Sequence, residues 1–385
     1  MRILQIIRKS GSAGILLWVW PLFSLVISRK REVEDYSIID RSALLQIGFI
    51  LACLVLTFFE VRKKRINLLR YCWMRPIRWI FLYLLLCGLS TLWSISPTYT
   101  AWMVIEAFVF LFLILLVLAN IKNKPKFAVN WIVLWAVYCG LLYAARAFKS
   151  GHVIEDVFSL HGLGIDVYAP IVLLSIFIVR KKLLYSFIIF LCIVSTATKA
   201  YVALLLGILT YSIMSKSLKW QSVAMFGVLG ILLCFLYWGG GDSISILFPG
   251  KTQHSIETGT GRTVAWQILI ESGLETPWLG KGFVVAERAA TENAATRIYI
   301  SHNSVIAAFV GTGIIGAMLV IMFFVDMVLL SYRSIRPVVW RPVFVASSFM
   351  MLFIAMVVNT IGSRLSGSWV VMVFMAGIIA ILAKK

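Results

Sequence analysis

Long apolar runs recur along the whole of this 385-residue chain, and they limit its fold more than any other feature. Each run has about 17–25 residues, which lets a helix cross a hydrocarbon core about 30 Å thick. The chain is 61% hydrophobic and 14% charged, with a mean hydropathy of +0.95, whereas soluble domains are about 45–50% apolar and about 25% charged. The sequence therefore predicts an all-α, polytopic membrane protein, in which residues 1–385 form a single integral membrane domain.

Twelve runs are predicted to be membrane spans, which places both ends of the chain on the same side. The predicted spans are residues 12–28, 42–60, 77–94, 101–120, 127–147, 166–180, 183–198, 200–214, 221–239, 302–330, 341–360 and 367–383. The stretch 183–214 is divided because it is longer than one span requires, and because a single helix would hold Lys199 near mid-bilayer at a cost of about 2.5–3.5 kcal/mol. The undivided alternative gives eleven spans and reverses the orientation of everything after it.

Lysine and arginine residues fall mainly in the short loops on one face of this topology. The densest groups are residues 62–78, 122–126, 180–182, 216–219 and 333–341. Because positively charged loops stay on the cytoplasmic side, we expect both termini to be cytoplasmic. The net charge of +20 then reflects topology and contact with anionic membrane lipids, and nucleic acid is not an expected partner.

One long hydrophilic segment, residues 240–301, lies between the ninth and tenth predicted spans on the extracytoplasmic side. Loops of this length are often functional. Within it, Gly-Thr-Gly-Arg262 leads into apolar residues at helical spacing, and Gly273 and Pro277 mark the end, so we expect an interfacial helix. Its first turn carries Arg262, one turn before Trp266.

An arginine at a helix N-terminus is unfavourable by about 0.3–1 kcal/mol, so Arg262 is not expected to serve helix stability. Free N–H groups and a guanidinium together suit a phosphate anion. The residues alone leave two alternatives for Arg262, which are diphosphate binding and a solvated surface arginine. Nearby, residues 277–282 (Pro-Trp-Leu-Gly-Lys-Gly) predict a tight turn with close backbone approach.

The tenth span opens with Ser301-His302-Asn303-Ser304. We expect Ser301 to be the N-cap and His302 to lie in the first helical turn, where the dipole favours a neutral imidazole. A general base needs that form, although a polar interface histidine is the plainer alternative. Residues 311–316 (Gly-Thr-Gly-Ile-Ile-Gly), inside the same span, predict close helix packing. The other histidines have no metal-ligand spacing, so no metal site is expected; these are His152, His161 and His254.

These segments, in this order and after a late span, resemble the O-antigen ligase/polymerase superfamily, which includes O-antigen ligases and Wzy-type polymerases. The matching segments are Gly-Arg262-x-x-x-Trp266 and those at 277–282, 302–303 and 311–316, together with Leu-Ser-Thr-Leu-Trp-Ser-Ile-Ser-Pro at 89–97. The resemblance implies a class C-like glycosyltransferase architecture in the bacterial inner membrane, with the active site facing the periplasm. It also implies an undecaprenyl diphosphate-linked glycan donor and metal-independent transfer without a cofactor.

In that family, a loop arginine binds the donor diphosphate and a loop histidine activates the acceptor hydroxyl. Arg262 and His302 match these positions. A second family arginine is replaced here by Lys199, which keeps the charge but loses the bidentate fork. The residues expected to support the loop are Trp266, Gly280, Gly282 and Asn303.

Three functions stay open. The segments Gly-Thr-Gly-Arg-Thr at 259–263 and Pro-Trp-Leu-Gly-Lys-Gly at 277–282 resemble exopolysaccharide polymerases slightly more, and this favours a polysaccharide polymerase, whose acceptor is a lipid-linked glycan. The first alternative is an O-antigen ligase, whose acceptor is lipid A core. The second is a polysaccharide transporter or lipid flippase, but no half-repeat is visible and few spans carry charges (Glu106 and Asp326 are the clearest). Other assembly proteins, such as a chain-length regulator, are further partners that the resemblance admits.

Overall fold

The computed structural model of the chain describes residues 10–27, 41–121, 198–215, 262–292, 301–335, 340–358, 361 and 367–383, with scattered positions between 130 and 142. Every regular element in these ranges is a helix. The helices are α2 (Gly11–Ile27), α3 (Arg41–Lys64), α4 (Leu68–Cys72), α5 (Ile77–Leu89), η2 (Ser90–Leu92), α6 (Pro97–Ile121), α11 (Thr198–Ser215), α15 (Arg262–Leu274), α16 (Val285–Glu292), α17 (Ser304–Arg333), α18 (Arg341–Val357) and α19 (Gly367–Ala383). The predicted all-α class is confirmed for this part of the chain.

Most of these helices coincide with predicted spans, namely α2, α3, α5 with η2, α6, α11, α17, α18 and α19. The short helices α4 and α16 were not predicted. The spans expected at 166–180, 183–198 and 221–239, and most of the one at 127–147, lie outside the described residues. The count of twelve spans, the division of 183–214 and the periplasmic loop therefore stay predictions.

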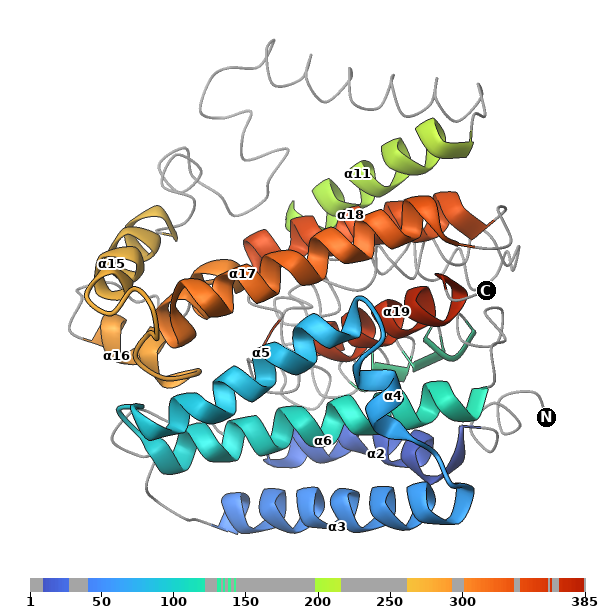
Figure 1. The fold of residues 1–385 in the computed structure, drawn as a ribbon, viewed down its shortest axis with the longest axis horizontal. Coiled ribbons are helices and arrows are strands. Elements are labelled where there is room, and N and C mark those ends of the chain that lie inside the picture. Colours follow the sequence, from blue (N-terminus) through green and yellow to red (C-terminus); the bar gives the residue numbers. More distant parts are fainter. Residues whose placement is uncertain are drawn as a thin grey trace, which may run out of the picture.

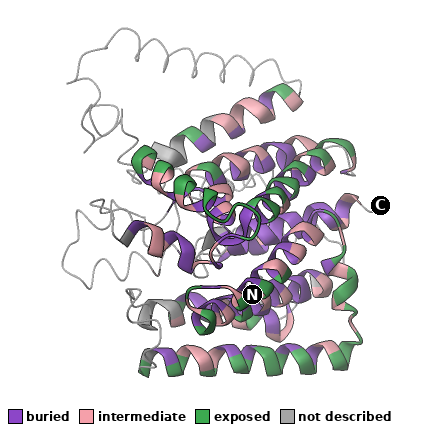
Figure 2. Ribbon diagram, turned by 60° about the vertical axis from the view of Figure 1, so that its left-hand side comes forward, coloured by how far each residue is buried: buried purple, intermediate pink, exposed green. Residues whose placement is uncertain are grey.

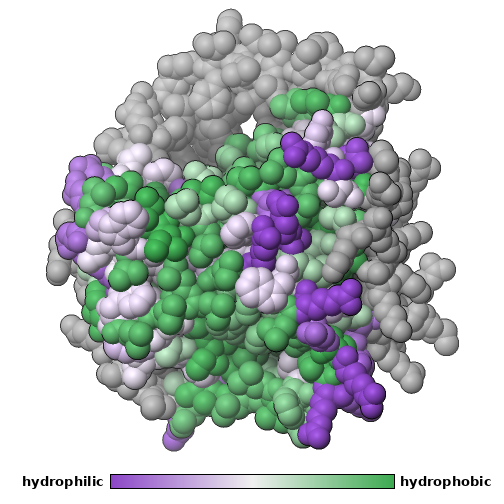
Figure 3. Space-filling model, viewed as in Figure 1, coloured by the Kyte–Doolittle hydropathy of each residue, from purple (hydrophilic) through white to green (hydrophobic). Residues whose placement is uncertain are grey.

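The bundle has an apolar exterior as well as an apolar interior. In the described ranges, three helical segments are long and apolar enough to cross a membrane: Ala43–Lys64, Pro97–Asn120 and Ser304–Arg333. Helix α3 lies on the outside of the bundle (Figures 1 and 2) and exposes large apolar side chains, with Phe58 and Phe59 each 60% exposed. Apolar surface covers most of the face in Figure 3. Such a surface is typical of a protein that contacts lipid, as a helical membrane protein does.

Two different ends can be defined for the bundle. At one, which we call the basic end, the Glu60 carboxylate of α3 accepts hydrogen bonds from the Ala13 N–H of α2 (3.1 Å) and from Asn120 Nδ2 of α6 (2.9 Å). The basic residues 62–78 follow α3 at this end, on the right of Figure 1. The opposite end, which we call the site end, holds η2, α15, α16 and the start of α17.

An ion pair ties the basic end to the middle of the fold. Arg75 donates to both carboxylate oxygens of Asp326 on α17, with Nε 2.8 Å from Oδ2, and Trp79 Nε1 donates to Oδ2 at 2.6 Å. Asp326 is 2% exposed. A buried carboxylate is stable only when charged or polar partners satisfy it. The acidic residue that the sequence places inside a span is thus part of the scaffold.

Replacing Arg75 by alanine removes two hydrogen bonds from this buried carboxylate. We expect the variant to lose about 1.5–3 kcal/mol of stability, as for hydrogen bonds to charged groups. Thermal or detergent-induced unfolding of the purified protein measures this loss. Arg70→Ala is the matched control, because Arg70 is exposed on the neighbouring helix α4. Equal stability of the two variants would contradict the scaffold role of the pair.

Candidate active site

Helix α17 is interrupted near its start. Thr312 has φ −136° and ψ 15°, and Gly313 has φ 71° and ψ −168°, so neither residue is helical. The conformation of Gly313 is open only to a residue without a Cβ atom. A break of this kind leaves backbone groups on both sides without their usual helical partners. In a membrane helix, other parts of the protein must satisfy those groups.

Residues 276–283, which we call the docking loop, supply these partners. Lys281 N–H donates to the Val310 carbonyl and Gly282 N–H to the Gly311 carbonyl, both at 2.9 Å. In the reverse direction, Ile314 N–H donates to the Pro277 carbonyl at 2.8 Å. The small residues at 311–316 therefore allow close packing as predicted, but the partner is this loop rather than a neighbouring helix.

The two glycines of the docking loop are required by two different contacts. Gly280 has φ +66° and Gly282 has φ +111°, both in the region that favours glycine. A Cβ atom on Gly280 would lie 2.5 Å from the Gly311 carbonyl carbon. A Cβ atom on Gly282 would overlap Ser94, so the two glycines allow the docking loop to approach both α17 and the segment at 89–97.

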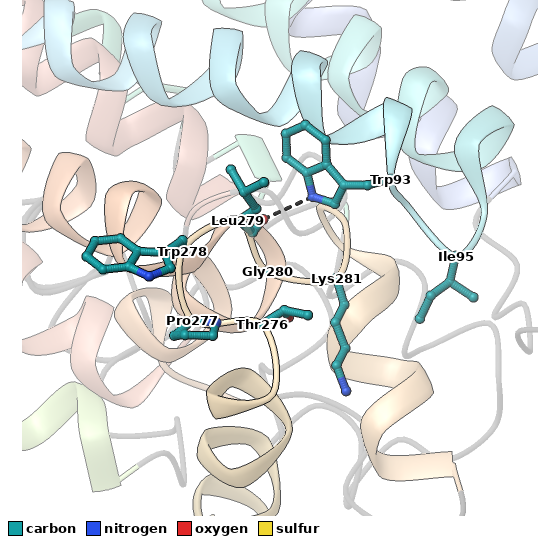
Figure 4. Close-up of a pocket in the computed structure, with 8 residues that line it drawn as sticks. All are labelled: Trp93, Ile95, Thr276, Pro277, Trp278, Leu279, Gly280 and Lys281. Atoms are coloured by element: carbon teal, nitrogen blue, oxygen red, sulfur yellow. Dashed lines mark hydrogen bonds between the residues drawn. The ribbon is translucent and has the colours of Figure 1, made fainter.

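A second segment holds the docking loop from the other side. Ser90 Oγ accepts a bond from Phe283 N–H at 3.2 Å, and Thr100 Oγ1 donates to the Phe283 carbonyl at 3.3 Å. Trp93 Nε1 donates to the Leu279 carbonyl at 3.0 Å (Figure 4). The segment at 89–97 and the loop at 277–282, far apart in the sequence, thus form one assembly with the break in α17.

A surface pocket of about 370 Å³ lies on this assembly (Figure 4). It is lined by Trp93, Ile95 and residues 276–281. Trp278 is 68% exposed beside it, which suits an aromatic residue at a membrane interface. The Lys281 ammonium is paired with Glu275 at 2.6 Å and with Ser272 at 2.8 Å. The pocket walls are mainly apolar, and its one cation already has an acidic partner.

Helix α15 begins at Arg262, the position that the sequence predicts. The buried residues of this helix are Ala265, Leu269 and Gly273, which lie on one face. Gly273 packs closely on α17, because a Cβ atom there would lie 2.5 Å from the ring of Phe309. Ile270, next to Leu269, is exposed. The Arg262 side chain is partly exposed at the first turn of the helix.

Trp266 connects this helix to the segment that carries His302. Its indole Nε1 donates to the Ser301 carbonyl at 2.5 Å. Since Trp266 lies one turn beyond Arg262, about 6 Å along the helix axis, the turn with the arginine is held close to the turn with the histidine. This hydrogen bond links α15 to the turn before α17, and the supporting role of Trp266 stays a prediction.

The expected cap of α17 was wrong by two residues. Asn303, in extended conformation, is the N-cap, and its side chain accepts bonds from Val305 N–H (2.9 Å) and Ile306 N–H (3.1 Å). Asparagine is at least as good a cap as serine, and Ser301 is occupied by other contacts. His302 precedes the helix and has φ +49°, a left-handed conformation. His302 therefore does not lie in the first helical turn, as the sequence predicted, where the helix dipole would favour a neutral imidazole.

Lys199 lies in the first described turn of α11, and its side chain is outside the description. One turn later, Ala203 packs with Ile354 and Val358 at the end of α18. The Val358 carbonyl in turn accepts a bond from Ser304 Oγ at 3.3 Å. The backbone of Lys199 is thus at the site end, near the start of α17.

Part of the chain matches a known protein family. Residues 183–321 match the Wzy_C family, described as O-Antigen ligase. Over these residues the chain is similar to that family. This match confirms the predicted resemblance and supports glycan transfer of the O-antigen ligase or polymerase type. No curated protein matches the chain.

The matched range contains Lys199, Arg262 and His302, as well as the docking loop and the break in α17. The residues that hold the loop from the other side, Ser90 and Trp93, lie outside the matched range.

Among the described residues, no group of three or more His, Cys, Asp or Glu side chains could hold a metal ion. The sequence reasoning missed Glu287, a buried residue of α16 that contacts Ser301; a lone glutamate in a polar loop carries no signal of burial.

Gly313→Ala tests whether the break in α17 organises the site end of the bundle. The added methyl group would overlap the Trp278 carbonyl, and an alanine at this φ costs about 1–2 kcal/mol before any clash. We expect a lower melting temperature in detergent and faster proteolysis of the docking loop. Gly48→Ala is the control, because a Cβ there meets nothing within 4 Å. A melting temperature equal to that of the control would contradict the assignment.

Proposed function

We propose that this protein is a membrane glycosyltransferase that moves a glycan from an undecaprenyl diphosphate-linked donor to a sugar hydroxyl. The observation that carries the proposal is the link from Arg262 through Trp266 to Ser301, the neighbour of His302. It joins a cationic helix start to a histidine within the range that matches the O-antigen ligase family. An anion-binding group and a proton acceptor are the two groups that this reaction needs.

The reaction breaks the bond between the anomeric carbon and a diphosphate oxygen, and negative charge grows on the departing diphosphate. Arg262 is partly exposed at the first turn of α15, where a guanidinium and helix N–H groups together stabilise such an anion. Lys199, whose backbone lies at the same end, is proposed to supply a second positive charge. With two cations, the diphosphate leaves without the need for a bound metal ion.

His302 is proposed to take the proton of the acceptor hydroxyl as its oxygen attacks the anomeric carbon. The side chain is partly exposed, although the residues on both sides of it are buried. A residue held in the left-handed region costs about 1–3 kcal/mol, and such strain often occurs at functional sites. The surrounding bonds to Ser301 and Asn303 therefore fix the direction in which the imidazole points.

The location follows from the two ends of the bundle. Basic loops stay in the cytoplasm, and residues 62–78 lie at the basic end. We therefore propose that the site end faces the periplasm, where the donor glycan is exposed on the outer leaflet of the inner membrane. The in-span acids support a scaffold rather than a transport path, because Asp326 binds Arg75 and Trp79, and Glu106 accepts a bond from Gln46 at 3.1 Å.

We expect His302→Ala and Arg262→Ala to abolish glycan transfer in cells that lack the native protein. Loss of a general base alone lowers a rate by about 10²–10⁴-fold. Arg262→Lys should be intermediate, because it keeps the charge but not the bidentate geometry. Arg62→Ala, at the basic end, is the control. Normal glycan levels in the alanine variants, with membrane insertion equal to that of the control, would reject the proposal.

The finer function is proposed to be that of a polymerase, which adds repeat units to a lipid-linked chain. The alternative is a ligase that joins finished O-antigen to lipid A core. The description of the matched family, O-Antigen ligase, favours this alternative. Both reactions use the same donor and differ in the acceptor.

A deletion strain separates these two reactions. We expect single repeat units on the carrier lipid or on the core, because a missing polymerase stops chain growth after the first unit. Mass spectrometry of extracted lipid-linked glycans and gel analysis of the lipopolysaccharide measure this. Full-length chains that remain on the carrier lipid would show a ligase instead, and restoration by the plasmid-borne gene is the control.

A further inference from the structure

Glu287 is a buried carboxylate next to the proposed catalytic histidine. It lies on α16 and is 6% exposed. Its Oε1 accepts a bond from Ser301 Oγ at 3.0 Å, and its Oε2 accepts one from Ser301 N–H at 3.4 Å. A buried carboxylate is costly unless polar partners satisfy it, so both contacts favour a single position of Ser301.

Ser301 is held from three directions. Besides Glu287, its carbonyl accepts the bond from Trp266 on α15. Its hydroxyl oxygen accepts a bond from Asn303 N–H at 3.2 Å. The hydroxyl proton has two acceptors in reach, the Asn303 carbonyl at 2.9 Å and the Glu287 carboxylate. The charged acceptor makes the stronger hydrogen bond, which leaves the oxygen lone pairs turned toward Asn303 N–H.

The consequence falls on His302, the residue between these two. Its neighbours Ser301 and Asn303 are both buried and bonded, whereas its own side chain is partly exposed. Its φ of +49° is unfavourable for an L-residue. Without Glu287, Ser301 would lose its two hydrogen bonds to α16, and the turn at His302 could relax toward an ordinary conformation, so that the imidazole would point elsewhere.

We propose that Glu287 is a positioning residue that acts through Ser301 to hold His302 in the orientation from which it removes the acceptor proton. The proposal rests on the function assigned to His302 above. Glu287 itself touches neither substrate. The requirement is for two hydrogen bonds at Ser301, not for a negative charge. Glutamine meets this requirement, because its amide oxygen accepts the Ser301 N–H and its amide nitrogen donates to the hydroxyl.

The test is steady-state transfer by the purified full-length protein in nanodiscs, with an undecaprenyl diphosphate-linked glycan as the varied donor. We expect Glu287→Ala to lower kcat at least tenfold and to leave the KM for the donor within about twofold, because Arg262 is untouched. Ser301→Ala should behave likewise, and Glu287→Gln should restore most of kcat. Glu271→Ala is the matched control, because Glu271 is exposed on α15 and bonded only locally to Gln267.

Hydrogen exchange of the backbone amides at 301–304 gives a second readout that does not depend on transfer. Faster exchange in Glu287→Ala than in Glu271→Ala, together with the kcat loss and the glutamine rescue, supports the proposal. Wild-type kcat in Glu287→Ala overturns it, and so does a glutamine variant that is folded but as slow as the alanine variant. A wild-type protein without any transfer would reject the proposed function instead, while the exchange result would still report whether Glu287 holds the turn.

Discussion

The break in α17 at Thr312 and Gly313 is the feature on which the site end depends. It removes helical hydrogen bonds at a place where lipid could not replace them, so the protein must do so. The docking loop supplies three backbone bonds, and Ser90, Trp93 and Thr100 then hold that loop in place. A defect in one helix thereby draws together segments from three regions of the sequence, and α15 and α16 flank the result.

The lipid bilayer, which acts as the solvent of the spans, explains which parts of this arrangement could be predicted from the sequence. A span must be a continuous apolar run, and its boundaries therefore show directly in the sequence, as α3 and α6 illustrate. The start of α15 at Arg262 could be predicted equally well, because a Gly/Thr cluster before periodic apolar residues is a local sequence signal. The family resemblance singled out the segments at 277–282 and 311–316. It did not indicate that they bind each other, since glycine spacing reports the need for close approach but not the partner.

The errors have a common physical origin. Ser301 and Asn303 are both good capping residues, and the choice between them was made by tertiary contacts from Trp266 and Glu287 that no local pattern contains. Glu287 resembles any solvated glutamate until α16 and the 301–304 turn are placed together.

For the proposed chemistry, this architecture combines a rigid backbone around His302 with side chains that can reach the substrates. The backbone around His302 is fixed by three helices: Trp266 from α15, Glu287 from α16 and the Asn303 cap of α17. The two side chains proposed to meet the substrates, Arg262 and His302, remain partly exposed. Transfer between two lipid-linked molecules needs the leaving diphosphate and the attacking hydroxyl to be aligned, and misplacement by about 1 Å can cost 10²-fold. A strained histidine held by buried neighbours meets that demand better than a flexible loop, because its strain is offset by contacts that solvent does not weaken.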